Sequence, residues 1–249
     1  MGLAFQNLMG PPSNYSRPFF DLLVESNPNI HNVFALQCCD WSNGYESSAH
    51  MVDGSFDVGG VNKANFHLPL LYTPVTERNF WAVDMLDVQV QGVSALPHYR
   101  KRNDTIRTEK ERQIAIENKD LPEMPQTIVD SGTSNLVFTM DLYDNVLKMI
   151  KKAVKTEYSD KIWSGDECLD LKTDLSSFWP NISLVFAGGN VDDPPFALVI
   201  PPCRYLSKTA KEDCDNGIDG YSFSIEGGEM DDGNIVGQVA YEVCLVKGS

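Results

Sequence analysis

Short runs of apolar residues recur along most of this chain, separated by Gly, Pro, Asn, Asp and Ser. Residues 81–90 partly alternate apolar and polar side chains, as a strand with one buried face does, and residues 221–225 alternate cleanly. Other runs are rich in β-branched and aromatic residues and end at turn-forming residues, which is typical of strands. They predict strands at residues 33–38, 56–61, 68–75, 179–186, 196–200 and 234–238. The pattern therefore predicts an all-β protein with a few short helices.

Two stretches have helical character instead. Residues 19–24 form a short apolar run that ends before Pro28, and a residue preceding proline is disfavoured in the α-helical region. In the second stretch, Asp141 lies near the start and lysines lie near the end, which suits the helix dipole. Its apolar residues recur mostly at three- and four-residue steps: Leu142, Val146, Leu147, Ile150 and Val154. We expect an amphipathic helix that packs against the core.

The stretch Thr127–Val137 differs from these elements because it carries a charge between two apolar runs. The first run leads into Asp130, a turn of Ser131, Gly132 and Thr133 follows, and the second run leads away. Such a turn can be a simple surface connection in which Asp130 bonds to its own backbone. It can also present one carboxylate rigidly for chemistry. This stretch is the candidate functional site of the chain.

The length and the net charge of the chain limit the classes of protein to which it can belong. The chain has 249 residues with 42% hydrophobic content, enough to bury a core in one domain or two lobes. Its 20 Lys and Arg against 35 Asp and Glu give a formal net charge of -15, which argues against a nucleic-acid partner because such a surface repels phosphate. Residues 98–126 are rich in charges and prolines, which predicts a solvated insertion loop; an acidic partner for its basic residues is the alternative.

The cysteines, histidines and glycosylation motifs indicate whether the protein binds a metal and whether it passes through the secretory pathway. The six cysteines form no Cys-x-x-Cys pair and the four histidines are scattered, so we expect no metal site and no cofactor. Disulfides are the expected use of the cysteines, and six of them allow several pairings. Asn-x-Ser/Thr motifs begin at Asn14, Asn103 and Asn181, which are candidate glycosylation sites. No apolar run approaches the length of a membrane span, and no leader pattern opens the chain.

Six short motifs follow one another along nearly the whole chain. They are Gly2-Leu3-Ala4-Phe5, Pro18-Phe19-Phe20-Asp21, Gly59-Gly60-Val61, Tyr72-Thr73-Pro74-Val75, Ile128-Val129-Asp130-Ser131-Gly132-Thr133 and Ile235-Val236-Gly237. In this order and spacing, the set resembles the pepsin-like aspartic protease family. The resemblance implies a bilobal, mostly antiparallel all-β fold. Residues 1–67 would be a remnant of the N-terminal lobe, residues 68–75 an inter-lobe strand, and residues 76–249 a C-terminal lobe that is incomplete at its end.

The resemblance also implies roles for the residues of the turn. Asp130 would be the catalytic carboxylate of the C-terminal lobe. The hydroxyl of Ser131 would join the hydrogen bonds between the two catalytic loops, Gly132 would allow their close approach, and Thr133 would bond to the carboxylate of Asp130. Residues 235–237 look like the strand that passes beside this loop. Cys168 and Cys214 match a disulfide of the C-terminal lobe.

The chemistry of this family needs two acids. Two carboxylates about 3 Å apart share one proton, so one can accept a proton from water while the other polarises the scissile carbonyl. The remaining Asp-Gly sequences lack the Asp-Ser/Thr-Gly order and are interpreted as loop aspartates: Asp53, Asp219 and Asp232. By the resemblance, the chain would begin inside the N-terminal lobe, after the first catalytic loop. We expect it to be inactive alone.

The function that the resemblance implies is that of an aspartic endopeptidase of the secretory pathway, acting on a peptide or protein substrate. The full-length form would be monomeric and either lysosomal or endosomal, extracellular, or tethered by a membrane anchor that this sequence does not contain. The alternative is a non-catalytic binding protein on a protease scaffold. A further alternative is a dimer in which two copies pair their Asp130 loops, although a symmetric dimer would have to accommodate the N-terminal residues.

Overall fold

The computed structural model of the protein describes residue 5 and residues 17–37, 55–62, 69–77, 79–96, 124–170, 172–173, 175–190, 192–228 and 233–240. Several predictions from the sequence fall outside these residues. They concern Asn14, Asn103, Cys38, Cys39, Cys244, Asp53, Asp232 and most of the loop 98–126.

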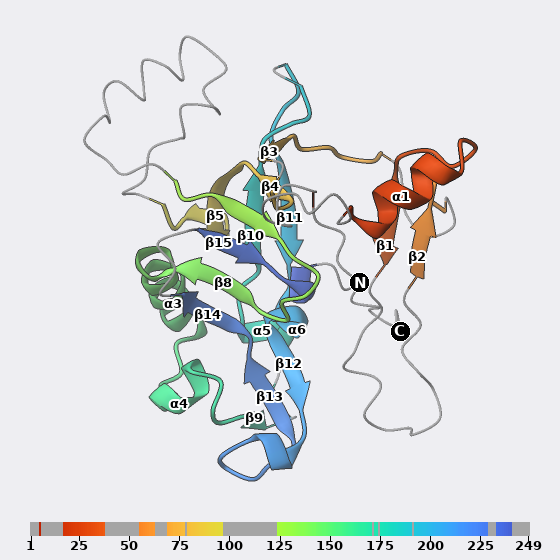
Figure 1. Ribbon diagram of the computed structural model, residues 1–249. Helices are drawn as coiled ribbons and strands as arrows, with labels where there is room; N and C mark the ends of the chain where they lie inside the picture. Colours follow the sequence, from red (N-terminus) through yellow and green to blue (C-terminus); the bar gives the residue numbers. More distant parts are fainter. Residues whose placement is uncertain are drawn as a thin grey trace.

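Strands outnumber helices in the described residues (Figure 1). The helices are α1 (Phe19–Ser26), α3 (Met140–Val154), α4 (Asp160–Trp163), α5 (Leu175–Phe178) and α6 (Pro202–Tyr205), with 3-10 helices η4 (Lys211–Asp213) and η5 (Gln238–Ala240). The strands are β1 (Phe34–Gln37), β2 (Ser55–Val58), β3 (Val75–Glu77), β4 (Ala82–Val83), β5 (Met85–Val90), β6 (Val93–Ser94), β7 (Thr127–Val129), β8 (Leu136–Thr139), β9 (Leu169–Asp170), β10 (Ile182–Phe186), β11 (Phe196–Ile200), β12 (Leu206–Thr209), β13 (Gly220–Phe223), β14 (Ile225–Gly228) and β15 (Asn234–Val236).

These strands form four sheets. The largest is a six-stranded sheet in the order β14-β8-β15-β7-β4-β3, in which β14 pairs with β8 and β15 with β7 in parallel. A four-stranded antiparallel sheet has the order β11-β10-β5-β6, and the others have the orders β12-β13-β9 and β1-β2. The predicted fold class, mostly antiparallel strands with few helices, is confirmed, with the two parallel pairs as an addition.

The core lies between helix α3 and the strands it covers, β5, β8 and β14. The predicted amphipathic helix is confirmed, since Leu142, Val146, Ile150 and Val154 are all buried along one side of α3. Removing such side chains from water stabilises the fold by about 1.5–3 kcal/mol each. Below this helix, the rings of Trp163 and Trp179 lie 5.5 Å apart and complete the core. We call residues 75–240 the body of the protein.

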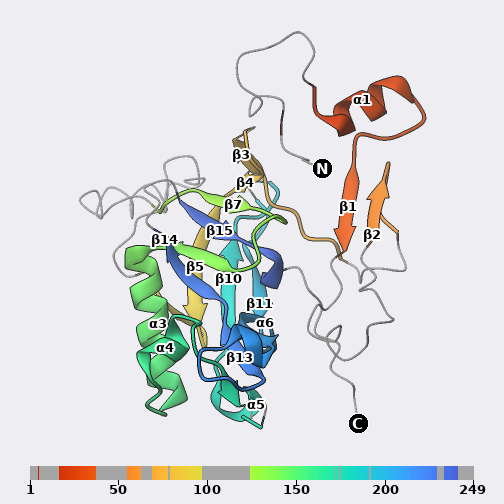
Figure 2. The ribbon, with the colours of Figure 1, turned by 60° about the horizontal axis from the view of Figure 1, so that its bottom comes forward.

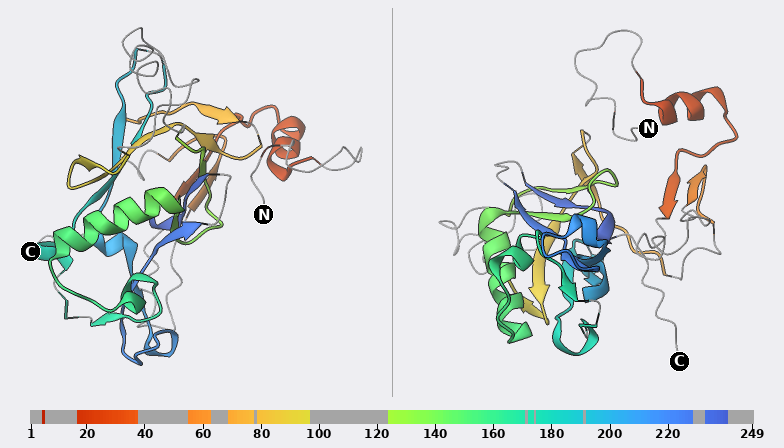
Figure 3. Two further views of the ribbon diagram at one scale, coloured as in Figure 1. Left: turned by 90° about the vertical axis from the view of Figure 1, so that its left-hand side faces the viewer. Right: turned by 90° about the horizontal axis from the view of Figure 1, so that it is seen from below.

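Residues 17–62 form a separate N-terminal region, in which α1, β1 and β2 lie to one side of the body (Figures 2 and 3). Among its described apolar side chains, only Pro18 and Phe20 are buried. The region contacts the body through an aromatic pair, since the ring of Phe34 lies 5.4 Å from that of Trp81. The ring of Phe5, which precedes the region, lies 4.5 Å from the same tryptophan. The predicted helix at residues 19–24 is confirmed as α1.

One predicted strand is wrong. Residues 69–74 have no strand structure, and β3 begins only at Val75. Pro69 and Pro74 explain the difference, because proline has no N–H to donate to a sheet. The strand expected at residues 56–61 ends at Val58, since Gly59 turns the backbone to φ +81°.

Two further differences concern the body. The strand predicted over residues 81–90 is divided into β4 and β5 at Asp84, which is buried. The solvated loop predicted over residues 98–126 extends too far, because Met124 is buried in the core and Thr127 starts β7 directly after. A long apolar side chain such as methionine fills gaps in a core well, and a charge-based prediction overlooks it.

Candidate active site

Asp130 follows the last residue of β7, and the turn it opens leads into β8. These two strands do not pair with each other, because β15 lies between them. Strand β15 pairs in parallel with β7, with Val236 opposite Val129, and antiparallel with β8, with Val236 opposite Leu136. A strand from about a hundred positions later in the chain therefore separates the two sides of the turn (Figure 1).

The carboxylate of Asp130 is held by its own turn. The backbone N–H of Gly132 donates to Asp130 Oδ1 at 2.8 Å, and the hydroxyl of Thr133 donates to Oδ2 at 2.7 Å. The backbone N–H of Asp130 donates to the carbonyl of Val236 at 3.1 Å, which fixes the main chain below the carboxylate. Each carboxylate oxygen thus accepts one hydrogen bond within the turn, and a carboxylate oxygen can accept more than one.

Gln238 and Val239, which follow Gly237 at the end of β15, hold the far side of the same turn. The backbone N–H of Gln238 donates to the carbonyl of Thr133 at 2.7 Å, and its side-chain Nε2 donates to the carbonyl of Ser131 at 2.8 Å. The backbone N–H of Val239 donates to the carbonyl of Ser134 at 3.2 Å. Three hydrogen bonds from residues 238–239 therefore restrain a turn that carries no buried apolar side chain of its own.

Glycine is required where β15 meets the turn. A Cβ atom on Gly237 would lie 2.2 Å from the carbonyl oxygen of Asn135 and 2.5 Å from that of Thr133, closer than any side chain can approach. At Gly132 a Cβ would lie 3.1 Å from Asp130 Oδ1, which is tight but not impossible. At Gly237 the close approach of two backbones, and not a special φ angle, requires glycine, whereas at Gly132 the neighbour is the carboxylate of Asp130.

The structure brings most of the residues predicted from the sequence together in one place. Asp130, Gly132 and Thr133 form the hydrogen-bonded turn, and Ser131 is exposed beside them. Asp219, interpreted as a loop aspartate, accepts a hydrogen bond from the backbone N–H of Lys211 at 3.0 Å in another loop. The sequence motifs did not identify Gln238 as a residue that holds the turn. Its position directly after Gly237 is the only sequence signal that could have indicated this role.

A pocket of about 660 Å³ opens beside this turn. The turn contributes Ser134 and Asn135 to its wall, and residues of α6, β12, β13, β14 and η5 form most of the rest. The side-chain amide of Asn135 donates a hydrogen bond to the carboxylate of Glu226 across the wall. The charged or polar side chains that line it include Glu226, Lys208, Asp213, Arg204 and Gln238.

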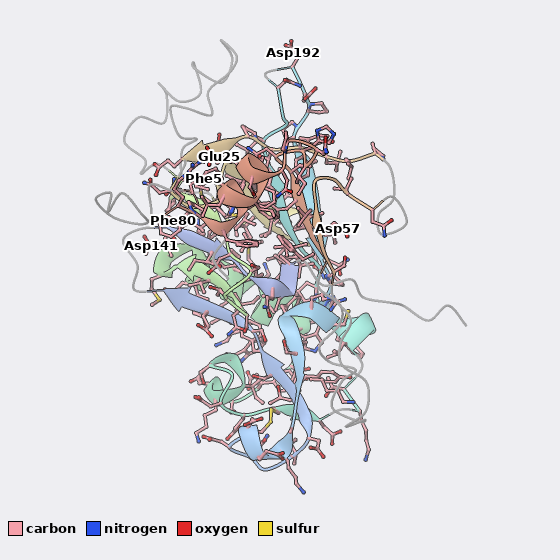
Figure 4. All side chains as sticks on the ribbon, turned by 45° about the vertical axis from the view of Figure 1, so that its right-hand side comes forward. Phe5, Glu25, Asp57, Phe80, Asp141 and Asp192 are labelled. Carbon is pink, nitrogen blue, oxygen red and sulfur yellow. A yellow bond between two sulfur atoms is a disulfide. The ribbon has the colours of Figure 1, made fainter. Side chains whose placement is uncertain are left out.

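The disulfide between Cys168 and Cys214 lies at the far end of the body, where Figure 4 shows it as a yellow bond. Its Cα atoms are 5.6 Å apart. Cys203 is also disulfide-bonded. In the part of the chain that the structure describes, no three His, Cys, Asp or Glu side chains gather as metal ligands, and no helix has the length and apolar character of a membrane span.

Comparison with known proteins agrees with the geometry of the turn. The sequence profile of the family described as eukaryotic aspartyl protease matches residues 1–241, nearly the whole chain. The chain belongs to this family. The resemblance to pepsin-like aspartic proteases that the ordered motifs indicated, nearest in appearance to beta-secretase, is thereby confirmed.

One relative of this aspartyl protease chain is a beta-secretase of Strongylocentrotus purpuratus. The two sequences are 25% identical over 264 residues. The aligned region covers 97% of this chain and 43% of the relative. The chain therefore spans less than half the length of the beta-secretase to which it is similar.

Proposed function

We propose that this chain supplies one of the two catalytic carboxylates of an aspartic endopeptidase, and that the carboxylate is Asp130. The observation that carries the proposal is the turn itself: a single carboxylate, oriented by the donors of Gly132 and Thr133, on a backbone restrained by β15. Membership of the aspartyl protease family supports it. A simple surface turn would need neither the inserted strand nor the glycine contact at residue 237.

The mechanism follows from the chemistry of a carboxylate pair. When a second carboxylate lies about 3 Å from Asp130, the pair holds one proton between them, because two like charges so close cannot both ionise easily. The ionised member removes a proton from water, and the protonated member donates a hydrogen bond to the carbonyl oxygen of the scissile peptide bond. The hydrogen bonds of Gly132 and Thr133 set the direction from which Asp130 meets that water.

The substrate in this proposal is a peptide or protein chain. The pocket that begins at Ser134 and Asn135 of the same turn offers hydroxyl, amide and charged side chains, which suit the polar backbone of an extended peptide together with its side chains. The proposal places the full-length protein in the secretory pathway as a monomer. The Cys168–Cys214 disulfide supports this location, because disulfides persist in oxidising compartments.

The sequence contains one Asp-Ser/Thr-Gly, so we propose that this chain alone does not hydrolyse peptides. An acid-range peptidase assay with a mixed peptide library tests this. The expected result is no cleavage above that of the Asp130→Asn variant. Robust cleavage that Asp130→Asn and a pepstatin-type inhibitor both abolish would overturn the proposed inactivity.

The catalytic role of Asp130 needs a separate test in the product of the complete reading frame. If that product carries a second Asp-Ser/Thr-Gly and cleaves peptides, Asp130→Asn is expected to abolish cleavage, and Asp219→Asn is the matched control that retains it. Retained activity in Asp130→Asn would refute the role. A frame without a second motif would favour the alternative, a binding protein on a protease scaffold, which the single motif of this chain also permits.

A further inference from the structure

The motif Asn181-Ile182-Ser183 lies at the start of β10, inside the described residues. Side chains alternate faces along a strand. Ile182 and Leu184 are fully buried and face the core, so Ser183 between them faces outward. Asn181, directly before the strand, is exposed. The two residues that a glycosylation signal needs are thus both on the outer side of the sheet.

The outer face of this sheet is open to solvent. Register places Ser183 between Val199 of β11 and Gln89 of β5, and Gln89 pairs with Ser94 of β6. Val199 is 52% exposed, and Val93 on the edge strand β6 is 60% exposed. This face therefore carries a polar row with the exposed Val199 on the edge strand β11, whereas Val93 pairs with the buried Val90 and lies on the other face of the edge strand β6.

Asn181 can carry a substituent without loss of any contact in the described structure. Its backbone carbonyl accepts a hydrogen bond from the N–H of Gln91 at 3.1 Å, which fixes the main chain. Its side-chain amide makes no hydrogen bond with any residue the structure describes. Asn234 is the opposite case, because it is fully buried and its side chain accepts a hydrogen bond from the N–H of Thr139.

We propose that Asn181 carries an N-linked glycan that covers the outer face of the β11-β10-β5-β6 sheet. In the transfer, the amide nitrogen of Asn181 forms a bond to C1 of the first sugar of a lipid-pyrophosphate-linked oligosaccharide. The bond from C1 to the phosphate oxygen breaks, the amide loses one proton, and the lipid pyrophosphate leaves. The inference rests on the secretory location that the proposed function includes, and it is independent of catalysis.

The glycan has a physical role at this position. Edge strands with exposed apolar side chains can pair with other chains, and a bulky hydrophilic group beside them opposes that association. The site lies next to the hairpin of β5 and β6, whose turn is bonded to Asn181. We therefore expect the glycan to reduce self-association of the folded protein without any effect on the Asp130 turn.

The test translates the full chain behind a secretion signal in the presence of endoplasmic reticulum microsomes. Translocated chains are treated with a peptide-N-glycosidase, which converts a glycosylated Asn to Asp, and the peptide containing residue 181 is examined by mass spectrometry. The expected result is Asp at position 181. Unconverted Asn181 in chains that have formed the Cys168–Cys214 disulfide would overturn the proposal, because those chains reached the oxidising lumen.

Substitutions in the glycosylation motif test the assignment of the glycan to Asn181. Asn181→Gln and Ser183→Ala are each expected to lower the number of glycans by one, and Ser183→Thr is expected to keep it. Asn29→Gln, an exposed asparagine outside any glycosylation motif, is the matched control and should change nothing. An unchanged number of glycans in Asn181→Gln would also refute the assignment. Peptidase activity is not measured, so a failure here is distinct from a failure of the proposed catalytic role.

Discussion

The body and the N-terminal region of this protein use aromatic side chains differently. In the body, the rings of Trp163, Trp179 and Phe223 are buried, and that of Trp163 contacts the other two. In the N-terminal region, Phe20 is buried, whereas Phe19 on the same helix is 51% exposed. Both regions have short strands with apolar residues. In the body, the long helix α3 covers β5, β8 and β14, whereas in the described part of the N-terminal region α1 meets β1 through the ring pair of Phe20 and Phe34. The difference indicates that burial depends on the layer packed against a strand more than on the strand's own sequence.

The two regions meet close to the candidate active site. Trp81 contacts Phe34 of the N-terminal region with its ring, and its backbone carbonyl accepts a hydrogen bond from the N–H of Val129, the residue before Asp130. The turn nevertheless depends on the body, because β15, β8 and Gln238 all belong to it. We therefore expect substitutions in the body to affect stability and the site strongly, and those in the N-terminal region to have small effects.

The largest difference is expected between two phenylalanines. Phe138 is fully buried in β8, so Phe138→Ala should lower the free energy of unfolding by about 3–5 kcal/mol. Phe19→Ala should change it by no more than about 0.5 kcal/mol, since that side chain is already exposed. Urea denaturation monitored by tryptophan fluorescence measures both. Equal effects would contradict the contrast between the regions.

Removal of the disulfide tests the far end of the body. Cys168 and Cys214 are 46 positions apart, and the double replacement by Ala should cost about 2–5 kcal/mol because the unfolded chain gains freedom. Hydrogen exchange should show faster opening in β9, β12 and β13 and little change in β1 and β2. Faster exchange confined to β1 and β2 would show that the two regions are coupled more tightly than their contacts indicate.

A pair of glycines tests the turn more directly. Gly237→Ala places a Cβ against the carbonyl oxygens of Asn135 and Thr133, so we expect a loss of about 1–3 kcal/mol and a displaced Asp130 turn. Gly60→Ala is the control, because a Cβ there meets nothing within 4 Å. Unfolding curves give the stability, and chemical shifts of the residues 130–135 report the turn. Unchanged shifts in Gly237→Ala would contradict the contact.

The smallest effect concerns Tyr205, whose hydroxyl donates to the carbonyl of Pro180 at 2.6 Å. Tyr205→Phe should cost about 1 kcal/mol at neutral pH. Burial raises the pKa of Tyr205 above its usual value, so the folded protein keeps a proton that the unfolded chain loses. The contribution is fully present below about pH 10 and falls as the pH rises above it. The wild type should therefore keep its full advantage over the variant up to about pH 10 and lose part of it as the pH rises further, as urea midpoints will show.

Periodicity in the sequence predicted the elements whose burial is decided locally. The apolar face of α3 has the expected residues inside, because period and hydrophobicity suffice to orient a helix. The clean alternation predicted over residues 221–225 is not followed by burial, since the structure divides this run into β13 and β14 and buries Ser224 between them. The strand expected at residues 68–75 was wrong, since apolar content was given more weight than the two prolines. The order in which the strands pair could not be predicted from the local sequence pattern, because nothing in that pattern indicates that β15 lies between β7 and β8.

By itself, the sequence determined which acid stands in a turn of small residues, Asp130, and which family its ordered motifs resemble. Only the tertiary structure decided how that acid is held. The hydrogen bond from Gln238 to Ser131 joins residues 107 positions apart, and the space beside Asn135 admits only the glycine of residue 237. Turn chemistry is local, whereas the approach of two backbones depends on how distant strands pair, and that is a property of the whole fold.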